Sequence, residues 1–115
     1  MSFAATTDQI MRRQKSVTRR LGWTFLKPGD RVMAVVKGQG LKKGEKVEKL
    51  GVIRIVSVRR ERLDAITWGD VVREGYAKMS PYDTTLHKGF IRHFCAMNRC
   101  DTATTVTRIE FSYDD

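Results

Sequence analysis

Three side chains of this sequence could together perform nucleophilic and acid–base chemistry: Lys15, Thr18 and Glu74. The stretch around Lys15 also carries the cations Arg13, Arg19 and Arg20. Their like charge disfavours protonated Lys15, which lowers its pKa and makes it a usable base toward the Thr18 hydroxyl. A carboxylate from elsewhere in the chain could orient the pair or carry a proton, and Glu74 is the best candidate. The remaining late acids fit helix caps, strand exteriors or the tail.

Whether Lys15 and Thr18 meet depends on local structure. They are three positions apart, so they share a face if a helix continues through them, whereas on a strand they point to opposite sides. The segment "TTDQIMRRQKSVTRRL" predicts a helix that Thr7 caps and that ends between Ser16 and Arg20. The same basic stretch is also compatible with a solvated face or a phosphate-binding surface.

Charge is concentrated in the first half of the chain. Residues 12–62 hold 16 Lys and Arg against four Asp and Glu, while residues 63–115 hold six against eight, within a net charge of +9. A polarised positive charge attracts polyanions, among which nucleic acid is common, although solubility alone could explain it. Nucleic acid such as RNA is therefore the expected partner.

Composition predicts one domain of a globular protein. A chain of 115 residues can bury a single core without metal or disulfides. No apolar run is long enough for a membrane span, no signal peptide is recognisable, and Cys95 with Cys100 suits a pair of free thiols. We therefore expect no membrane association, and a cytoplasmic location. Oligomeric state is not indicated.

Further elements are expected beyond the first helix. A strand should start near Arg31 after the "LKPGD" turn, and a glycine- and lysine-rich loop should span residues 37–49. A long strand should follow to about residue 63. Thr67 is a plausible cap for a short helix that Gly75 ends, and a second helix capped by Ser80 should run to about Asn98. A strand over residues 104–113 closes an α+β fold, best arranged as a small, strongly bent sheet or barrel flanked by helices.

Motifs of common enzyme families and of metal sites are missing from the sequence. It contains no phosphate-binding glycine loop, nucleophile elbow or HExxH motif. The segment "HFCAMNRC" matches no standard zinc-ligand spacing, and Cys95 falls on an apolar helical face. We therefore expect no metal and no cofactor.

Several of these segments resemble the ASCH domain, a relative of the PUA fold, over about residues 9–113. The resemblance rests on "RQKSVTRR", "LKPGDRV", "VSVRRERLDAIT", "GDVVREG" and "VTRIEF". The family signature is usually written GxKxxExR; here Lys15 and Arg20 match it, Arg13 replaces the Gly, and Thr18 stands where Glu is frequent. The resemblance implies a small mixed PUA-like β-barrel with short flanking helices.

With Thr18 at this place, the segment is similar to that of small bacterial ASCH enzymes, which hydrolyse the acetyl amide of N4-acetylcytidine. The resemblance implies Lys15 as proton acceptor, Thr18 as nucleophile and Glu74 as proton donor. It also implies another function, because ASCH and PUA domains as groups resemble RNA-binding modules and a few members are reported to cut RNA. Under that alternative the ligand contacts would come from cations and one stacking aromatic: Arg13, Lys15, Arg19, Arg20, Trp23, Lys42, Lys43, Lys46 and Lys49. A protein-binding regulator with an acidic partner is a third possibility.

Overall fold

In the computed structural model, a curled four-stranded sheet carries short helices. The structure describes residues 1–37, 43–44, 46–76 and 85–114. The strands are β1 (Val17–Arg20), β2 (Arg31–Val35), β3 (Lys49–Arg62) and β4 (Thr105–Tyr113). The helices are η1 (Ala4–Thr6), α1 (Thr7–Met11), η2 (Leu63–Ala65), α2 (Trp68–Arg73) and α3 (Thr85–Asn98). The α+β class is confirmed.

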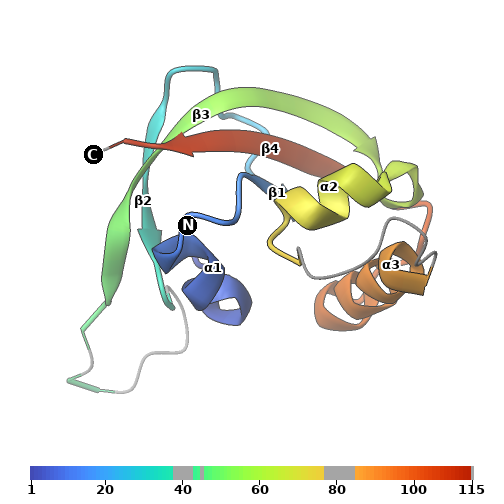
Figure 1. The fold of residues 1–115 in the computed structure, drawn as a ribbon, viewed down its shortest axis with the longest axis horizontal. Helices are drawn as coiled ribbons and strands as arrows, with labels where there is room; N and C mark the ends of the chain where they lie inside the picture. The colour runs from blue at the N-terminus through green and yellow to red at the C-terminus, as the bar shows by residue number, and fades with distance from the viewer. Residues whose placement is uncertain (38–42, 45, 77–84, 115) are drawn as a thin grey trace.

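The strand order is β1-β4-β3-β2, and each neighbouring pair is antiparallel. A parallel bridge joins Ser2 to Val35 at the outer edge of β2. Register shifts interrupt the β2–β3 and β3–β4 ladders, and such irregularities bend strands. Figure 1 shows β3 and β4 as two long curved strands that arch over α1 and α3. The sheet therefore forms a half-barrel.

The predicted first helix is wrong in its length and its cap. It ends at Met11, because Arg13 adopts a left-handed backbone conformation with φ 56°. Thr7 does not cap it; its hydroxyl instead donates to the carbonyl of Phe3 at 2.8 Å. Residues 17–20 form β1, which pairs with β4 through Thr18 and Ile109 among others. Residues 17–20 form a strand because they pair with β4, although the local sequence pattern favours a helix.

The other predicted elements are confirmed where the structure describes them. The Thr67 hydroxyl accepts a hydrogen bond from the Asp70 N–H at 3.2 Å at the start of α2. Gly75, with φ 109°, follows the end of this helix. The predicted cap at Ser80 lies outside the described residues, as does Lys42 of the predicted binding set.

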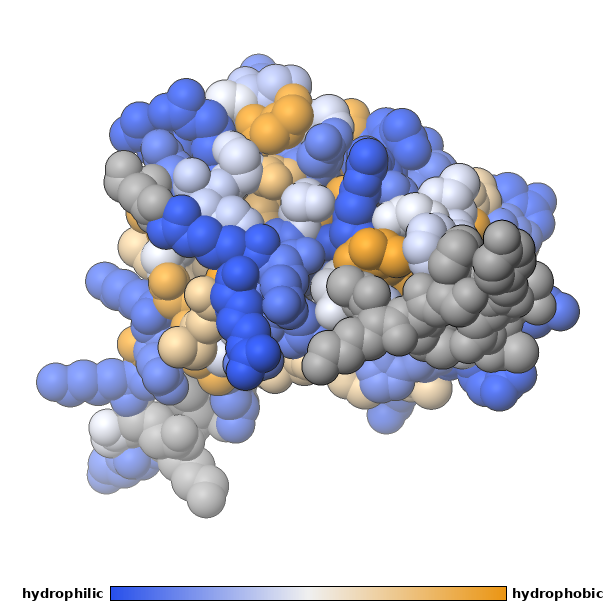
Figure 2. All heavy atoms as spheres, in the orientation of Figure 1, coloured by the Kyte–Doolittle hydropathy of each residue, from blue (hydrophilic) through white to orange (hydrophobic). Residues whose placement is uncertain are grey.

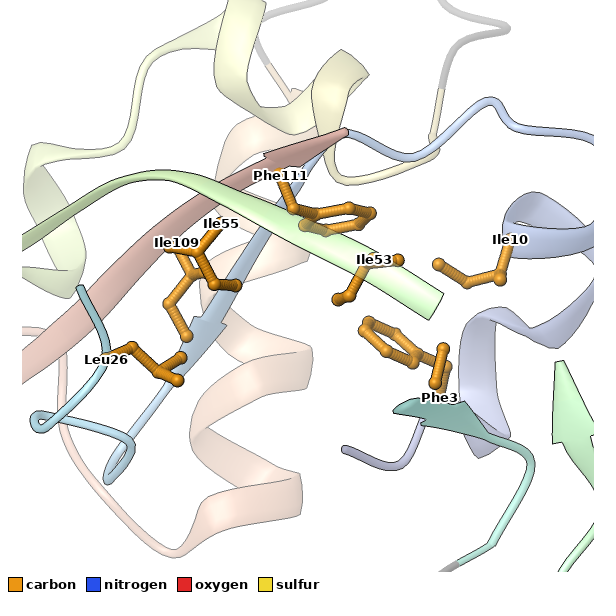
Figure 3. Close-up of a cluster of buried hydrophobic side chains, with 8 residues drawn as sticks. Phe3, Ile10, Leu26, Ile53, Ile55, Ile109 and Phe111 are labelled. Carbon is orange, nitrogen blue, oxygen red and sulfur yellow. The ribbon is translucent and has the colours of Figure 1, made fainter. Parts of the chain in front are cut away.

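Two hydrophobic clusters support the sheet. The larger one contains Phe3, Ile10, Leu26, Ala34, Ile53, Ile55, Ile109 and Phe111, most of which Figure 3 labels. The second contains Leu63, Ile66, Val71, Ile91, Phe94 and Val106, and it fixes α2 and α3 to the end of the sheet. Within the described residues, no helix is long and apolar enough to cross a bilayer.

Candidate functional site

Lys15 and Glu74 form a buried ion pair at the centre of the site. The Lys15 ammonium donates to the main-chain oxygen of Glu74 at 2.8 Å and contacts Oε2 at 3.4 Å. Their side chains are 5% and 3% exposed. The Ser16 N–H donates to the Arg73 carbonyl, and the Phe111 N–H donates to the Ser16 carbonyl. This backbone pairing holds Lys15 between α2 and β4.

The carboxylate of Glu74 is fixed on two sides. Its Oε1 accepts a hydrogen bond from the main-chain N–H of Arg19 at 3.0 Å, while Oε2 faces Lys15. Glu74 is the residue at the end of α2, and Gly75 follows it. A Cβ at Gly75 would lie 2.8 Å from Cγ of Gln9, so the absence of a side chain allows α1 and the end of α2 to approach closely.

Thr18 and Arg20 lie two positions apart on β1 and therefore project to the same side of the sheet. The Arg20 Nε–H donates to Oγ1 of Thr18 at 3.2 Å, and its Nη2 donates to the carbonyl of Ser2 at 2.7 Å. The guanidinium group lies over the ring of Phe3, 4.8 Å from its centroid. Arg20 thus links the hydroxyl to the N-terminal segment.

A cavity of about 260 Å³ brings these groups together. Its polar and charged lining residues include Lys15, Thr18, Arg20 and Glu74. The N-terminal segment contributes Phe3, and α3 contributes Phe90, His93, Phe94, Met97 and Asn98. The cavity therefore has a polar region beside aromatic and apolar walls.

Burial moves the pKa values of the central pair in opposite directions. Loss of hydration lowers the pKa of Lys15 and raises the pKa of Glu74, although the attraction between the two charges acts against both shifts. The positive charge of Arg20 further lowers the pKa of Lys15. The site therefore favours a neutral amine and a protonated carboxyl more than water does, as a base and an acid require.

Solved structures of other proteins share this architecture. An ASCH domain from Lactobacillus crispatus JV V101 superposes with a TM-score of 0.59 at 18% identity, covering 95% of this chain and 70% of that one. The chain has an ASCH-like fold. A DUF984 protein from Enterococcus faecalis V583 gives a TM-score of 0.65 at 14% identity, with coverage of 96% and 68%. No family model and no curated protein sequence matches the chain.

Five of the residues singled out from the sequence therefore line one cavity of the ASCH-like fold: Lys15, Thr18, Arg19, Arg20 and Glu74. The helix expected to bring Lys15 to Thr18 is not present. Lys15 instead precedes β1 in an irregular segment, held by its contacts with Glu74 and by the Tyr113 hydroxyl, which donates to its carbonyl at 2.5 Å. Tertiary contacts, rather than helical spacing, bring these residues to the same cavity.

Arg19 has a different environment from its neighbours. Its guanidinium is 0% exposed and pairs with Glu61 at 2.7 Å and with Asp70 at 2.5 Å. Asp70 in turn accepts hydrogen bonds from Arg108 at 2.7 and 3.0 Å. The side chain of Arg19 therefore has carboxylate partners inside the protein, and its guanidinium is not among the proposed ligand contacts.

The remaining predicted contacts lie elsewhere. The Arg13 guanidinium lies 5.4 Å from the ring centroid of Tyr113. Trp23 is half-buried against the larger hydrophobic cluster and packs on Phe25 with ring centroids 5.5 Å apart. Three of the predicted lysines are exposed: Lys43 and Lys46 in the β2–β3 connection, and Lys49 at the start of β3. In Figure 1 the coloured part of this connection lies at the lower left, on the far side of α1 from α3.

Sequence reasoning missed the contribution of α3. Phe94 belongs to the second hydrophobic cluster and Phe90 packs against it, while His93 lies in the segment "HFCAMNRC", which was considered only for metal binding. Both aromatic residues and His93 line the cavity, which a helical wheel does not reveal because it cannot tell core from cavity wall. Among the described residues, no group of His, Cys, Asp and Glu could hold a metal ion.

Proposed function

We propose that the cavity binds a modified nucleoside and hydrolyses its acyl amide, with N4-acetylcytidine as the substrate to test. One observation carries this proposal: a buried amine and carboxyl, with shifted pKa values, line the same cavity as a hydroxyl that accepts a hydrogen bond from an arginine. Nucleophile, base and acid are the three groups that amide hydrolysis through an acyl-enzyme needs.

The chemistry assigns one role to each group. Oγ1 of Thr18 attacks the amide carbonyl while its proton passes to the neutral amine of Lys15. The carbon–nitrogen bond then breaks, and the protonated carboxyl of Glu74 gives its proton to the leaving nitrogen of cytosine. Water hydrolyses the acyl ester, with the Glu74 carboxylate taking a proton from that water and the Lys15 ammonium returning one to Thr18.

The cavity also suits a ligand of limited size. Its volume of about 260 Å³ lies just below the range of roughly 300–1,000 Å³ usual for drug-sized ligands. The half-buried Phe90 of α3 borders it, and aromatic faces stack on nucleobases. We therefore assign a single nucleoside, rather than an oligonucleotide, to the interior.

The test is the absorbance change of N4-acetylcytidine with the purified protein. Wild type should release cytidine and acetate, and K15A, T18A and E74Q should each lower kcat by about 100-fold or more. K27A serves as the control because Lys27 is exposed and remote from the cavity lining. Absence of turnover by wild type at high enzyme concentration would exclude this substrate.

RNA binding is the second candidate function, supported by a separate surface. Lys43 and Lys46 are exposed in the β2–β3 connection, and Lys49 is exposed at the start of β3. Figure 2 shows hydrophilic side chains over much of this face of the molecule, including its lower left. Such lysines attract phosphates without reading sequence. Incubation with labelled RNA, followed by gel analysis, separates simple binding from strand cleavage.

A further inference from the structure

Arg20 places a positive charge beside the proposed nucleophile. Within the described part of the chain, no ion pair to Arg20 is present, whereas the adjacent Arg19 contacts two carboxylates. The Arg20 guanidinium instead donates to the hydroxyl oxygen of Thr18 and to the carbonyl of Ser2. The face of the Phe3 ring covers one side of it.

Holding a cation in this environment is unfavourable for the folded protein. Burial lowers the pKa of Arg20, while the more distant charge of Glu74 acts in the opposite direction. An uncompensated, partly desolvated charge costs stability unless negative charge appears near it. Enzymes retain such groups where negative charge develops during reaction, because preoriented donors stabilise the transition state there.

We infer that Arg20 is a further catalytic residue, whose guanidinium contacts the nucleophile and stabilises the negative charge that develops as Thr18 attacks. This inference rests on the proposed amide hydrolysis. As the Thr18 proton moves to Lys15, the new bond forms between Oγ1 and the carbonyl carbon, and the carbonyl π electrons move to its oxygen. Arg20 keeps all its protons and acts through its Nε–H and its charge.

Arg20 has a second effect on the same step, through the base. The charged groups that act on the Lys15 ammonium are Glu74 from the end of α2 and Arg19 and Arg20 from β1, while the Tyr113 hydroxyl from β4 donates to the Lys15 main-chain carbonyl. Only Glu74 among them favours the ammonium form, and the two arginines oppose it. Removing the charge of Arg20 should therefore raise the pKa of Lys15 and leave less of it as a free amine.

The experiment compares R20Q and R20K with R60Q on N4-acetylcytidine. Arg60 is the matched control because its Nη1 also donates to a threonine hydroxyl, that of Thr107, at 2.7 Å, but outside the cavity. R20Q should lower kcat about 100-fold with KM changed by less than about threefold. R20K keeps the charge but loses the Nε–H, and it should recover about a tenth of wild-type kcat. R60Q should match wild type.

Two further readouts separate catalysis from a structural role. The pH profile of R20Q should move to higher pH, and the pKa of Lys15, followed by NMR of labelled lysine, should rise; R20K should leave both near wild type. If R20Q raises KM while kcat stays unchanged, Arg20 only binds substrate and the inference fails. If the wild type does not hydrolyse this substrate at all, the proposed function and the inference fail together.

Discussion

The main-chain N–H of Arg19 donates a hydrogen bond to Oε1 of Glu74 at 3.0 Å, although the two residues lie 55 positions apart in the sequence. The side chain of the same Arg19 pairs with Asp70, which lies on α2 one helical turn before Glu74. One residue of β1 thus holds α2 at two points. The position of the proposed acid depends on this connection.

Removal of the Asp70 carboxylate should destabilise the fold. D70N would leave the guanidinium groups of Arg19 and Arg108 buried with less compensation, and breaking a buried pair of this kind costs roughly 3 kcal/mol. The free energy of unfolding, from urea denaturation, measures this loss. The control is D64N, because Asp64 forms an exposed pair with Arg62. Equal denaturation midpoints for both variants would contradict the prediction.

The same carboxylate should make stability depend on pH. Hydrogen bonds from Arg108 and then from Arg19 hold the pKa of Asp70 well below its ordinary value of 3.8, although burial acts against this. A group whose pKa is depressed by folding contributes stability above its unfolded pKa and loses it as pH falls toward the folded pKa. Stability should therefore decrease as pH falls below about 4, and less so in D70N. Denaturation at pH 6 and pH 3 tests this.

The sequence predicted the elements whose signals are local. Thr67 caps α2, Gly75 follows its end, and β3 and β4 coincide with long runs rich in β-branched residues. The short strand β1 was missed because its four residues carry no alternation of apolar and polar side chains. Its strand conformation comes from pairing with β4, a contact between distant parts of the chain.

Charge was a misleading guide to burial in this molecule. Arg19 and Arg108 look like surface residues in the sequence, but both are buried because Asp70 lies between them. Asp70 lies in the first turn of α2, and nothing in its spacing indicates the partners it meets. Lys15 and Glu74 were selected for their chemistry, and their contact likewise depends on the tertiary fold.

A side chain at Gly75 should disturb the site more than one at a comparable glycine. Gly75 and Gly29 have φ values of 109° and 93°, so alanine is strained at both. At Gly75 the new Cβ also meets Gln9 at 2.8 Å, whereas at Gly29 it meets nothing within 4 Å. G75A should lose roughly 1 kcal/mol more stability than G29A, and it should lower kcat by shifting Glu74. Thermal denaturation and turnover of the two variants provide the comparison.

Replacing the central ion pair with neutral side chains should preserve the fold while removing activity. In K15M/E74Q no charge remains to be desolvated, and such replacements are often neutral or stabilising by about 1–4 kcal/mol. E74Q alone keeps the Lys15 amine buried without its carboxylate partner and should be less stable than the double variant. Urea denaturation of wild type, E74Q and K15M/E74Q gives the free energies of unfolding that test this order of stability. A double variant less stable than E74Q would indicate that the pair contributes net stability.

The salt dependence of RNA affinity should show whether RNA phosphates bind at the cavity or at the exposed lysines Lys43, Lys46 and Lys49. If these lysines contact RNA phosphates, each contact contributes about 0.7 to the slope of log affinity against log salt for a single strand. Replacing Lys43, Lys46 and Lys49 with alanine should then reduce the slope by about 2 and leave hydrolysis of N4-acetylcytidine unchanged.

The control variant K15M should leave the salt slope unchanged and remove hydrolysis, because Lys15 is buried against Glu74 and offers no charge to phosphate. Filter binding over a salt series provides the slopes. Equal slopes for wild type and the triple variant would exclude this surface from RNA binding, and a slope reduced by K15M would place phosphate at the cavity instead.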